Sequence, residues 1–319
     1  MTVAIPPRGV TRTVLLFGYI AVNLATFAAQ AHAATITAAY ASSITSDPNA
    51  AAIESTINQA VQFYDQHIST PVTVAIDFQE MTSGLGESST YYGIITYSQY
   101  LSALQSHSSG NAVDTAALAS LPAGPNNPVN GNTMMDVTTA NLRALGFSVN
   151  PPAGQPDSTI SLNTSITNYG GSYNASFYSL LAVVEHEMDE ALGLGSNLDS
   201  GTTGAIRPED LFRYSASGVR SYTTSSSATS YFSIDGGVTN LINFNQAGGG
   251  SDYGDWATSG TPHVQDAYGT PGSAPVLGVE LTALDAIGYN FVSTPEPASF
   301  WLVGLGLGAV CLLVRRRCA

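Results

Sequence analysis

The chain has 319 residues, 9 basic and 23 acidic, with a formal net charge of −14 and 44% hydrophobic residues, enough for a sizeable core. Five of the nine basic residues, all arginines, lie near the two ends, so residues 34–294 (the body) hold 22 acidic side chains against four arginines. A body this acidic lacks the basic surface that nucleic acid requires, which excludes nucleic acid as a partner. Both cysteines fall within the last nine residues, which excludes a disulfide framework, a thiolate metal site and a cysteine nucleophile from the body.

The N-terminal segment has the three parts of a secretory signal peptide. Arg8 and Arg12 form the charged region, and an apolar stretch follows over 14–27. Ala31-His32-Ala33 is the small-x-small pattern at which signal peptides are cleaved. We therefore predict a signal peptide over 1–33 and an exported mature chain.

The body is predicted to be one α+β domain over 34–294. Apolar residues at helical spacing predict a helix over 51–69 that begins near Asp47-Pro48, and β-branched alternation predicts a strand over 72–78. The further elements predicted in chain order are a Gly/Ser loop over 82–90, a strand over 91–97, a helix over 98–105, a loop-rich stretch over 110–128, a helix over 134–145, a strand over 158–162, a helix over 174–194, a hairpin of 231–235 and 238–244, a long loop over 248–275 and a helix over 279–287.

The last 25 residues form an ordered pattern of their own. Pro295-Glu296-Pro297 is followed by an apolar segment over 298–314, near the lower length limit of a membrane span, and then by three arginines. This order resembles the PEP-CTERM sorting signal of Gram-negative bacteria over 295–319. The resemblance implies an exported, membrane-anchored precursor, processing by an exosortase-type enzyme, and a final location at the cell surface or in the extracellular matrix.

The run over 178–196 carries the most chemical information in the body. On a helix, His186 and Glu190 lie one turn apart on the same face, so both side chains can reach one divalent ion. Glu187 lies about 100° around the helix axis and can approach that ion from the side, where it could take a proton from water. The alternative interpretation is that Glu187, Asp189 and Glu190 form a solvated acidic helix face.

This run resembles the active-site helix of metzincin-type zinc metalloproteases, in particular the matrixin-like branch, whose pattern is His-Glu-x-x-His-x-x-Gly-x-x-His. His186, Glu187 and the Ala-Leu-Gly-Leu-Gly sequence over 191–195 fall on that pattern. The resemblance implies a metzincin-like α+β fold with a twisted sheet, a long site helix and a loop-rich C-terminal part. It also implies zinc bound by His186 and Glu190, with Glu187 as the catalytic base. Three later runs fit the same resemblance: Pro208–Tyr214, Tyr253–Trp256 and Leu281–Tyr289.

The chain departs from the metzincin pattern at two ligand positions. Glu190 stands in place of the second histidine and Ser196 in place of the third. A carboxylate is an ordinary zinc ligand, but a neutral hydroxyl is a poor one, so the third ligand must come from elsewhere. The candidates for the third ligand are Asp199, His263 and Asp266. Separately, the acids at 252, 255 and 266 are candidates to hold calcium.

The predicted function is a secreted, surface-sorted zinc-dependent endopeptidase. Its substrate would be a peptide or protein, and the strand before the site helix would pair with it in an extended form. The alternative is a catalytically degenerate matrix protein that binds extracellular polysaccharide through a surface rich in Tyr and Asn. A third interpretation is a purely structural surface protein.

Overall fold

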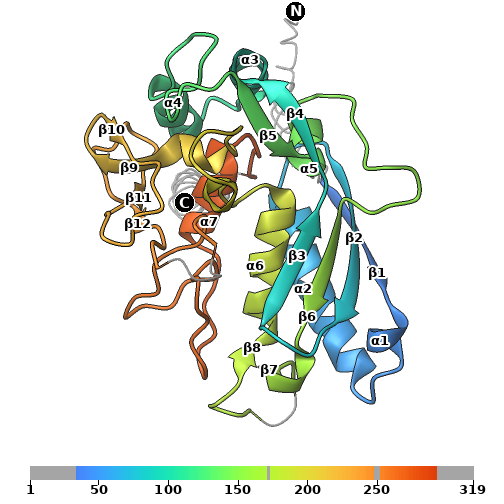
Figure 1. The fold of residues 1–319 in the computed structure, drawn as a ribbon. Helices are drawn as coiled ribbons and strands as arrows, with labels where there is room; N and C mark the ends of the chain where they lie inside the picture. The colour runs from blue at the N-terminus through green and yellow to red at the C-terminus, as the bar shows by residue number, and fades with distance from the viewer. Residues whose placement is uncertain (1–33, 171–172, 248–251, 293–319) are drawn as a thin grey trace, which may run out of the picture. The chain divides into compact units, whose positions relative to one another are not determined.

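The computed structural model describes residues 34–170, 173–247 and 252–292, so the predicted signal peptide and sorting signal lie outside the described residues. The described part is a mixed α+β structure, as predicted (Figure 1). Its α-helices are α1 (Ser42–Thr45), α2 (Ala50–His67), α3 (Tyr97–His107), α4 (Ala112–Ala119), α5 (Thr139–Ala144), α6 (Leu180–Leu192) and α7 (Val279–Ala286). No helix within these ranges is long and apolar enough to span a membrane.

The main sheet has four strands in the order β1-β2-β6-β3. These strands are β1 (Thr35–Tyr40), β2 (Thr73–Glu80), β6 (Ser158–Leu162) and β3 (Gly86–Thr90). The first three run parallel, and β3 runs antiparallel to β6 at one end of the sheet. The strand predicted to pair with a substrate, β6, is therefore paired on both sides and has no free edge for one. In the described part of the chain, the free edge nearest the site helix belongs to β3.

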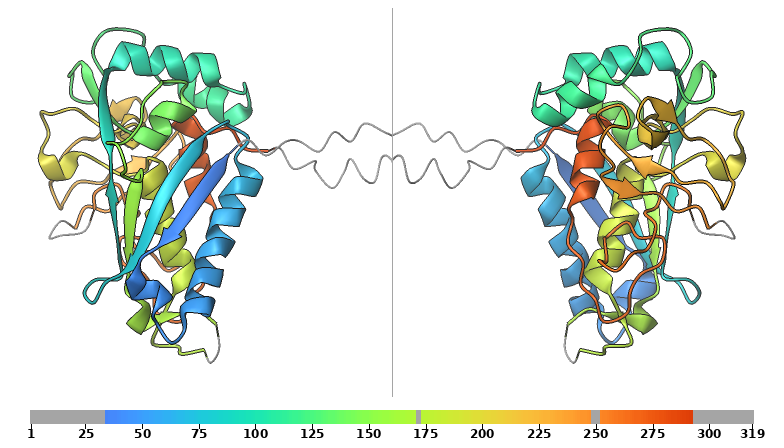
Figure 2. Two further views of the ribbon diagram at one scale, coloured as in Figure 1. Left: turned by 90° about the vertical axis from the view of Figure 1, so that its right-hand side faces the viewer. Right: turned by 90° about the vertical axis from the view of Figure 1, so that its left-hand side faces the viewer.

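Two long helices, α2 and α6, pack side by side against this sheet (Figures 1 and 2). The buried residues of β2 alternate at Val74, Ile76 and Phe78, as expected for a strand with one face on the core. α2 packs against β1, and α6 packs against β3 and β6. This arrangement places the predicted site helix directly beside the edge strand.

Smaller sheets surround this core. An antiparallel ribbon pairs β4 with β5, β7 pairs in parallel with β8, and a second sheet has the order β10-β9-β11-β12. Their bounds are β4 (Tyr92–Thr96), β5 (Met134–Thr138), β7 (Thr167–Asn168), β8 (Tyr178–Ser179), β9 (Arg213–Ala216), β10 (Val219–Arg220), β11 (Tyr231–Phe232) and β12 (Ile242–Asn243). The hairpin predicted around Gly236-Gly237 is confirmed, with shorter strands than expected.

Three sequence predictions in the first half of the body were wrong. The predicted loop over 82–90 contains the strand β3, and the loop-rich stretch over 110–128 contains the helix α4. The helix predicted over 134–145 is instead β5 followed by α5. The change occurs at Thr138, whose side-chain oxygen accepts a hydrogen bond from the Asn141 amide and so begins a new helix.

The ends of α6 are defined by local chemistry. The Ser179 hydroxyl accepts a hydrogen bond from the Ala182 amide at the first turn. The helix ends at Gly193, whose φ of 134° is reached easily only by glycine. α6 therefore begins six residues later than the predicted helix, and it carries His186, Glu187 and Glu190 on its second half.

Candidate metal centre

Three side-chain donors from two parts of the chain converge beside α6. His186 Nε2 lies 3.6 Å from Glu190 Oε1 and 3.6 Å from Asp255 Oδ1. Within the described ranges, these three residues are the group whose donor atoms all lie within 4.8 Å of one another. Four ligands placed tetrahedrally around a zinc ion at about 2.0–2.2 Å would be about 3.3–3.6 Å apart. The two separations from His186 Nε2 fall at the upper limit of this range.

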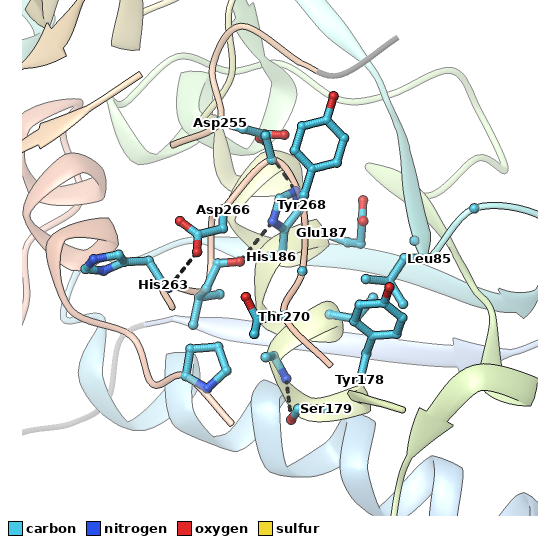
Figure 3. A pocket seen from close by; sticks show the side chains of 18 of the residues that line it. Leu85, Tyr178, Ser179, His186, Glu187, Asp255, His263, Asp266, Tyr268 and Thr270 are labelled. Atoms are coloured by element: carbon cyan, nitrogen blue, oxygen red, sulfur yellow. Dashed lines mark hydrogen bonds and ion pairs between the residues drawn. The ribbon is translucent and has the colours of Figure 1, made fainter. Parts of the chain in front are cut away.

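Each of the three donors is held by a partner outside the group. His186 Nδ1 lies 3.0 Å from the Val264 carbonyl oxygen, which leaves Nε2 directed at the two carboxylates. The Ser88 hydroxyl donates to Glu190 Oε2 at 2.6 Å, and Gln265 Nε2 donates to Asp255 Oδ1 at 3.2 Å. Outer hydrogen bonds of this kind fix the orientation of metal ligands. Figure 3 shows His186 beside Asp255, with a dashed line between the two side chains.

Asp255 reaches the helix because two backbones touch. A Cβ on Gly254 would lie 2.6 Å from the carbonyl carbon of Gly195 and 2.7 Å from the amide nitrogen of Ser196, so only glycine fits there. The residue after Asp255 is also anchored. Trp256 is fully buried, and its amide donates to the Gln265 carbonyl at 2.8 Å. The loop before α7 is thereby held against the C-terminal end of α6.

Glu187 lies beside the cluster, between α6 and β3. Its side chain is buried, and a Cβ on Gly86 of β3 would lie 2.9 Å from the Glu187 carboxyl carbon. Burial first, and then the neighbouring Glu190 carboxylate, raise the pKa of Glu187 well above its usual range. A carboxyl group with a raised pKa, at the wall of a cleft, has the properties of a general acid–base residue.

The ionisation of the cluster reflects crowded negative charge. Burial lowers the pKa of His186, but Asp255 and the two glutamates outweigh burial, so the net pKa is raised well above its usual value. Burial raises the pKa of Asp255 well above its usual range. Burial also acts to raise the pKa of Glu190, but the hydrogen bond and positive charge of His186, together with the Ser88 hydroxyl and the charge of Arg207, lower it by more. The cluster therefore holds an excess of negative charge, which a divalent cation would neutralise.

The cluster lies on the wall of a cleft of about 600 Å³. Residues 84–88, which lead into and form part of β3, line one side, and residues 263, 264 and 266–270 of the late loop line the other (Figure 3). Tyr178, Val183 and Leu85 add an apolar portion beyond the cluster. The cleft is therefore large enough for several side chains of a substrate, and the acidic cluster forms part of its wall.

The predicted site residues are only partly brought together. His186, Glu187 and Glu190 line the same cleft, as expected for the motif. His263 and Asp266 also line the cleft but are outside the three-donor cluster, and the His263 amide donates to Asp266 Oδ2 at 3.0 Å. Asp199 lies in a short 3-10 turn after α6 and does not line the cleft. The third donor of the cluster is Asp255, for which the sequence predicts only a calcium-binding role.

Ser196 has a structural role. Its side chain is buried, and its hydroxyl donates to Asp210 Oδ1 at 2.5 Å. Asp210 also accepts from the amides of Asn197 and Arg207, while Glu209 accepts from the amide of Gly195. The run over 208–214 therefore holds the loop that leaves α6. Ser196, at the position that would carry a third histidine, is therefore bonded to this run.

Comparison with known proteins adds one finding. Residues 293–317 match the PEP-CTERM protein-sorting motif. No curated protein and no solved structure is significantly similar to this chain. The motif marks the chain as an exported, membrane-anchored precursor that an exosortase-type enzyme processes, and it supports surface sorting.

Proposed function

We propose that this surface-sorted protein is a metal-dependent peptidase whose zinc ion is held by His186, Glu190 and Asp255. The observation that carries the proposal is the convergence of three donor atoms, each held by its own outer hydrogen bond. One imidazole nitrogen and two carboxylate oxygens are donors that zinc accepts in catalytic sites. The crowded carboxylates favour a cation at the same point. A metzincin-like chain fold remains part of this proposal.

The reaction follows from the position of Glu187. When bound, a zinc ion supplies Lewis-acid polarisation of a peptide carbonyl. Glu187 would accept a proton from the water that attacks this carbonyl, hold it on its carboxylate, and release it to the leaving nitrogen. Because its pKa is raised by burial, Glu187 binds that proton more firmly than an exposed glutamate would. Its role is thus separate from that of the ligands.

The free edge of β3 is the proposed contact for an extended substrate, in place of the strand predicted from sequence. The Asn163 amide donates to the Leu85 carbonyl, and the Tyr91 amide donates to the Asp157 carbonyl, both at 3.0 Å. Odd-numbered residues of this strand therefore direct their main-chain groups toward β6. Because main-chain direction alternates along a strand, Gly86 and Ser88 direct theirs to the outer edge, beside the cleft. A peptide added there would run past the metal centre.

The test is metal content and peptide cleavage in the full-length protein and three variants. Wild-type protein should bind zinc and cleave unfolded protein substrates. Glu187→Gln should retain zinc and lose about 10²–10⁴-fold in rate, whereas His186→Ala should lose both. Asp255→Asn should weaken zinc binding. Cleavage that survives in Glu187→Gln at the wild-type rate would contradict the role given to Glu187.

The residues predicted earlier as third ligands provide matched controls. Asp266→Asn and His263→Ala change residues of the same cleft, and Asp199→Asn changes an acid just after α6. All three should keep zinc affinity within a few-fold of wild type if Asp255 is the third ligand. If the wild-type protein binds no zinc, the peptidase proposal fails, and the alternative of a matrix protein that binds extracellular polysaccharide becomes the better one.

A further inference from the structure

We propose that Ser88 is a positioning residue that joins the substrate-binding edge of β3 to the metal ligand Glu190; this inference rests on the proposed metal centre. Ser88 is the middle residue of β3 and is half-buried. Its hydroxyl donates to Glu190 Oε2 at 2.6 Å. The other oxygen of the same carboxylate, Oε1, is the atom that lies 3.6 Å from His186 Nε2. The two oxygens of Glu190 thus have different partners.

This division fixes how Glu190 can bind a cation. With Oε2 engaged by the hydroxyl, Glu190 presents only Oε1 to the point that His186 and Asp255 also face. A free carboxylate would rotate about its terminal torsion, which has a broad energy profile. Loss of the hydroxyl would therefore leave the ligand with several orientations, of which only some place an oxygen at the metal. Outer partners of metal ligands are typically worth about 10–100-fold in metal affinity.

The main chain of Ser88 has a second task. Its amide and carbonyl are among those directed to the outer edge of β3, as the pairing of Leu85 and Tyr91 with their neighbours indicates. A peptide that pairs with this edge would bond to the backbone of the residue whose side chain holds Glu190. Substrate binding and metal binding would then stabilise the same position of β3, and each would strengthen the other by an equal factor.

The neighbouring residue offers a matched control. Ser89 precedes Thr90 on the same strand, but its side chain is exposed on the opposite face from Ser88. Ser89→Ala therefore makes the same chemical change on the same edge strand without touching Glu190. Ser88→Thr keeps a hydroxyl at the position that Ser88→Ala empties, so it serves as the rescue variant.

The experiment measures zinc affinity of the full-length protein by competition with a chromophoric chelator. Ser88→Ala should bind zinc about 10–100-fold more weakly than wild type. Ser88→Thr should recover most of that loss, and Ser89→Ala should stay at the wild-type value. An unchanged melting temperature of metal-free Ser88→Ala would show that folding is intact. A non-cleavable extended peptide should tighten zinc binding in wild type, and should do so less in Ser88→Ala.

The possible outcomes separate the two proposals. If wild type binds zinc, His186→Ala does not, and Ser88→Ala binds zinc as tightly as wild type, the role of Ser88 is overturned while the metal centre stands. Equal losses in Ser88→Ala and Ser89→Ala would overturn it as well, because they would reflect the strand and not the hydrogen bond. If wild type binds no zinc, the metal centre itself is wrong and the inference falls with it.

Discussion

Gly86 provides a way to move the proposed base without changing any ligand. It lies on β3 directly over α6, and a Cβ added there would meet the Glu187 carboxylate. The same Cβ would lie 2.8 Å from Val183 Cγ1, well inside ordinary van der Waals contact. The Glu187 side chain lines the cleft and can swing into it, whereas Val183 belongs to the helix and can give way only slightly. Gly86→Ala should therefore displace the carboxylate more than the helix.

The expected magnitudes follow from this geometry. Overpacking of one methyl group costs about 1–3 kcal/mol of unfolding free energy, with a melting temperature lowered by about 2–4 °C per kcal/mol. The rate of peptide cleavage should fall much further, by about 10²–10⁴-fold, because the base no longer reaches the attacking water. Zinc affinity should change little, since His186, Glu190 and Asp255 are not in the path of the new methyl group.

The assay compares cleavage rate per folded molecule, zinc affinity and melting temperature in one series. Gly93→Ala is the matched control, because a Cβ on this residue of β4 would lie 2.7 Å from Leu142 Cδ1, away from the cleft. It should lose stability to a similar degree while keeping its rate. Were Gly86→Ala to cleave as fast as Gly93→Ala, the reasoning that places Glu187 under β3 as the base would be refuted.

Three further predictions concern other parts of the molecule. Burial, opposed by a hydrogen bond from Asn111 and supported by the nearby Asp114, raises the pKa of Asp285 to about 7, so the folded state binds a proton more tightly than the unfolded state. Its stabilising contribution should be present below about pH 4 and be lost as the pH rises to about 7; Asp285→Asn should flatten that part of the stability–pH curve, measured by thermal melting. Ser196→Ala should cost about 1–3 kcal/mol of unfolding free energy, because Asp210 loses a buried partner, while zinc affinity stays unchanged. Intact-mass analysis of material from a bacterium with an exosortase should give a mature chain that lacks both the signal peptide and the C-terminal arginine cluster; the full tail on the surface form would contradict sorting.

Much of the core around the site could be predicted from the sequence, because its patterns are periodic. α2, β2, β6 and α7 coincide with predicted elements to within a few residues, and each buries a regular set of apolar side chains. The relative placement of His186 and Glu190 followed from helix geometry alone. These elements are stabilised by burial of their own apolar residues, so the local sequence shows a periodic apolar pattern.

β3 has no such periodic apolar pattern in its sequence. Its sequence, Gly-Glu-Ser-Ser-Thr, has no apolar residue, and its side chains are half-buried or exposed. The strand exists because its main chain pairs with β6 over the register from Gly86–Leu162 to Thr90–Ser158. Its glycine and serine then matter for contacts with α6, not for strand propensity. A reading based on periodicity therefore interprets this stretch as a loop, and misses Ser88 with it.

The departure from the metzincin pattern at Ser196 and the origin of the third donor have one physical explanation. Ser196 is buried against Asp210, so the loop after α6 is held by the run over 208–214 and offers no donor to the cleft. Gly254 lies against the main chain of that same loop, and this contact brings the next residue, Asp255, to within 3.6 Å of His186 Nε2. The third donor is thus created by a contact between two loops that are almost sixty residues apart in the chain. Motif spacing along one helix cannot encode such a contact, which is why the helix motif predicted two donors and left the third open.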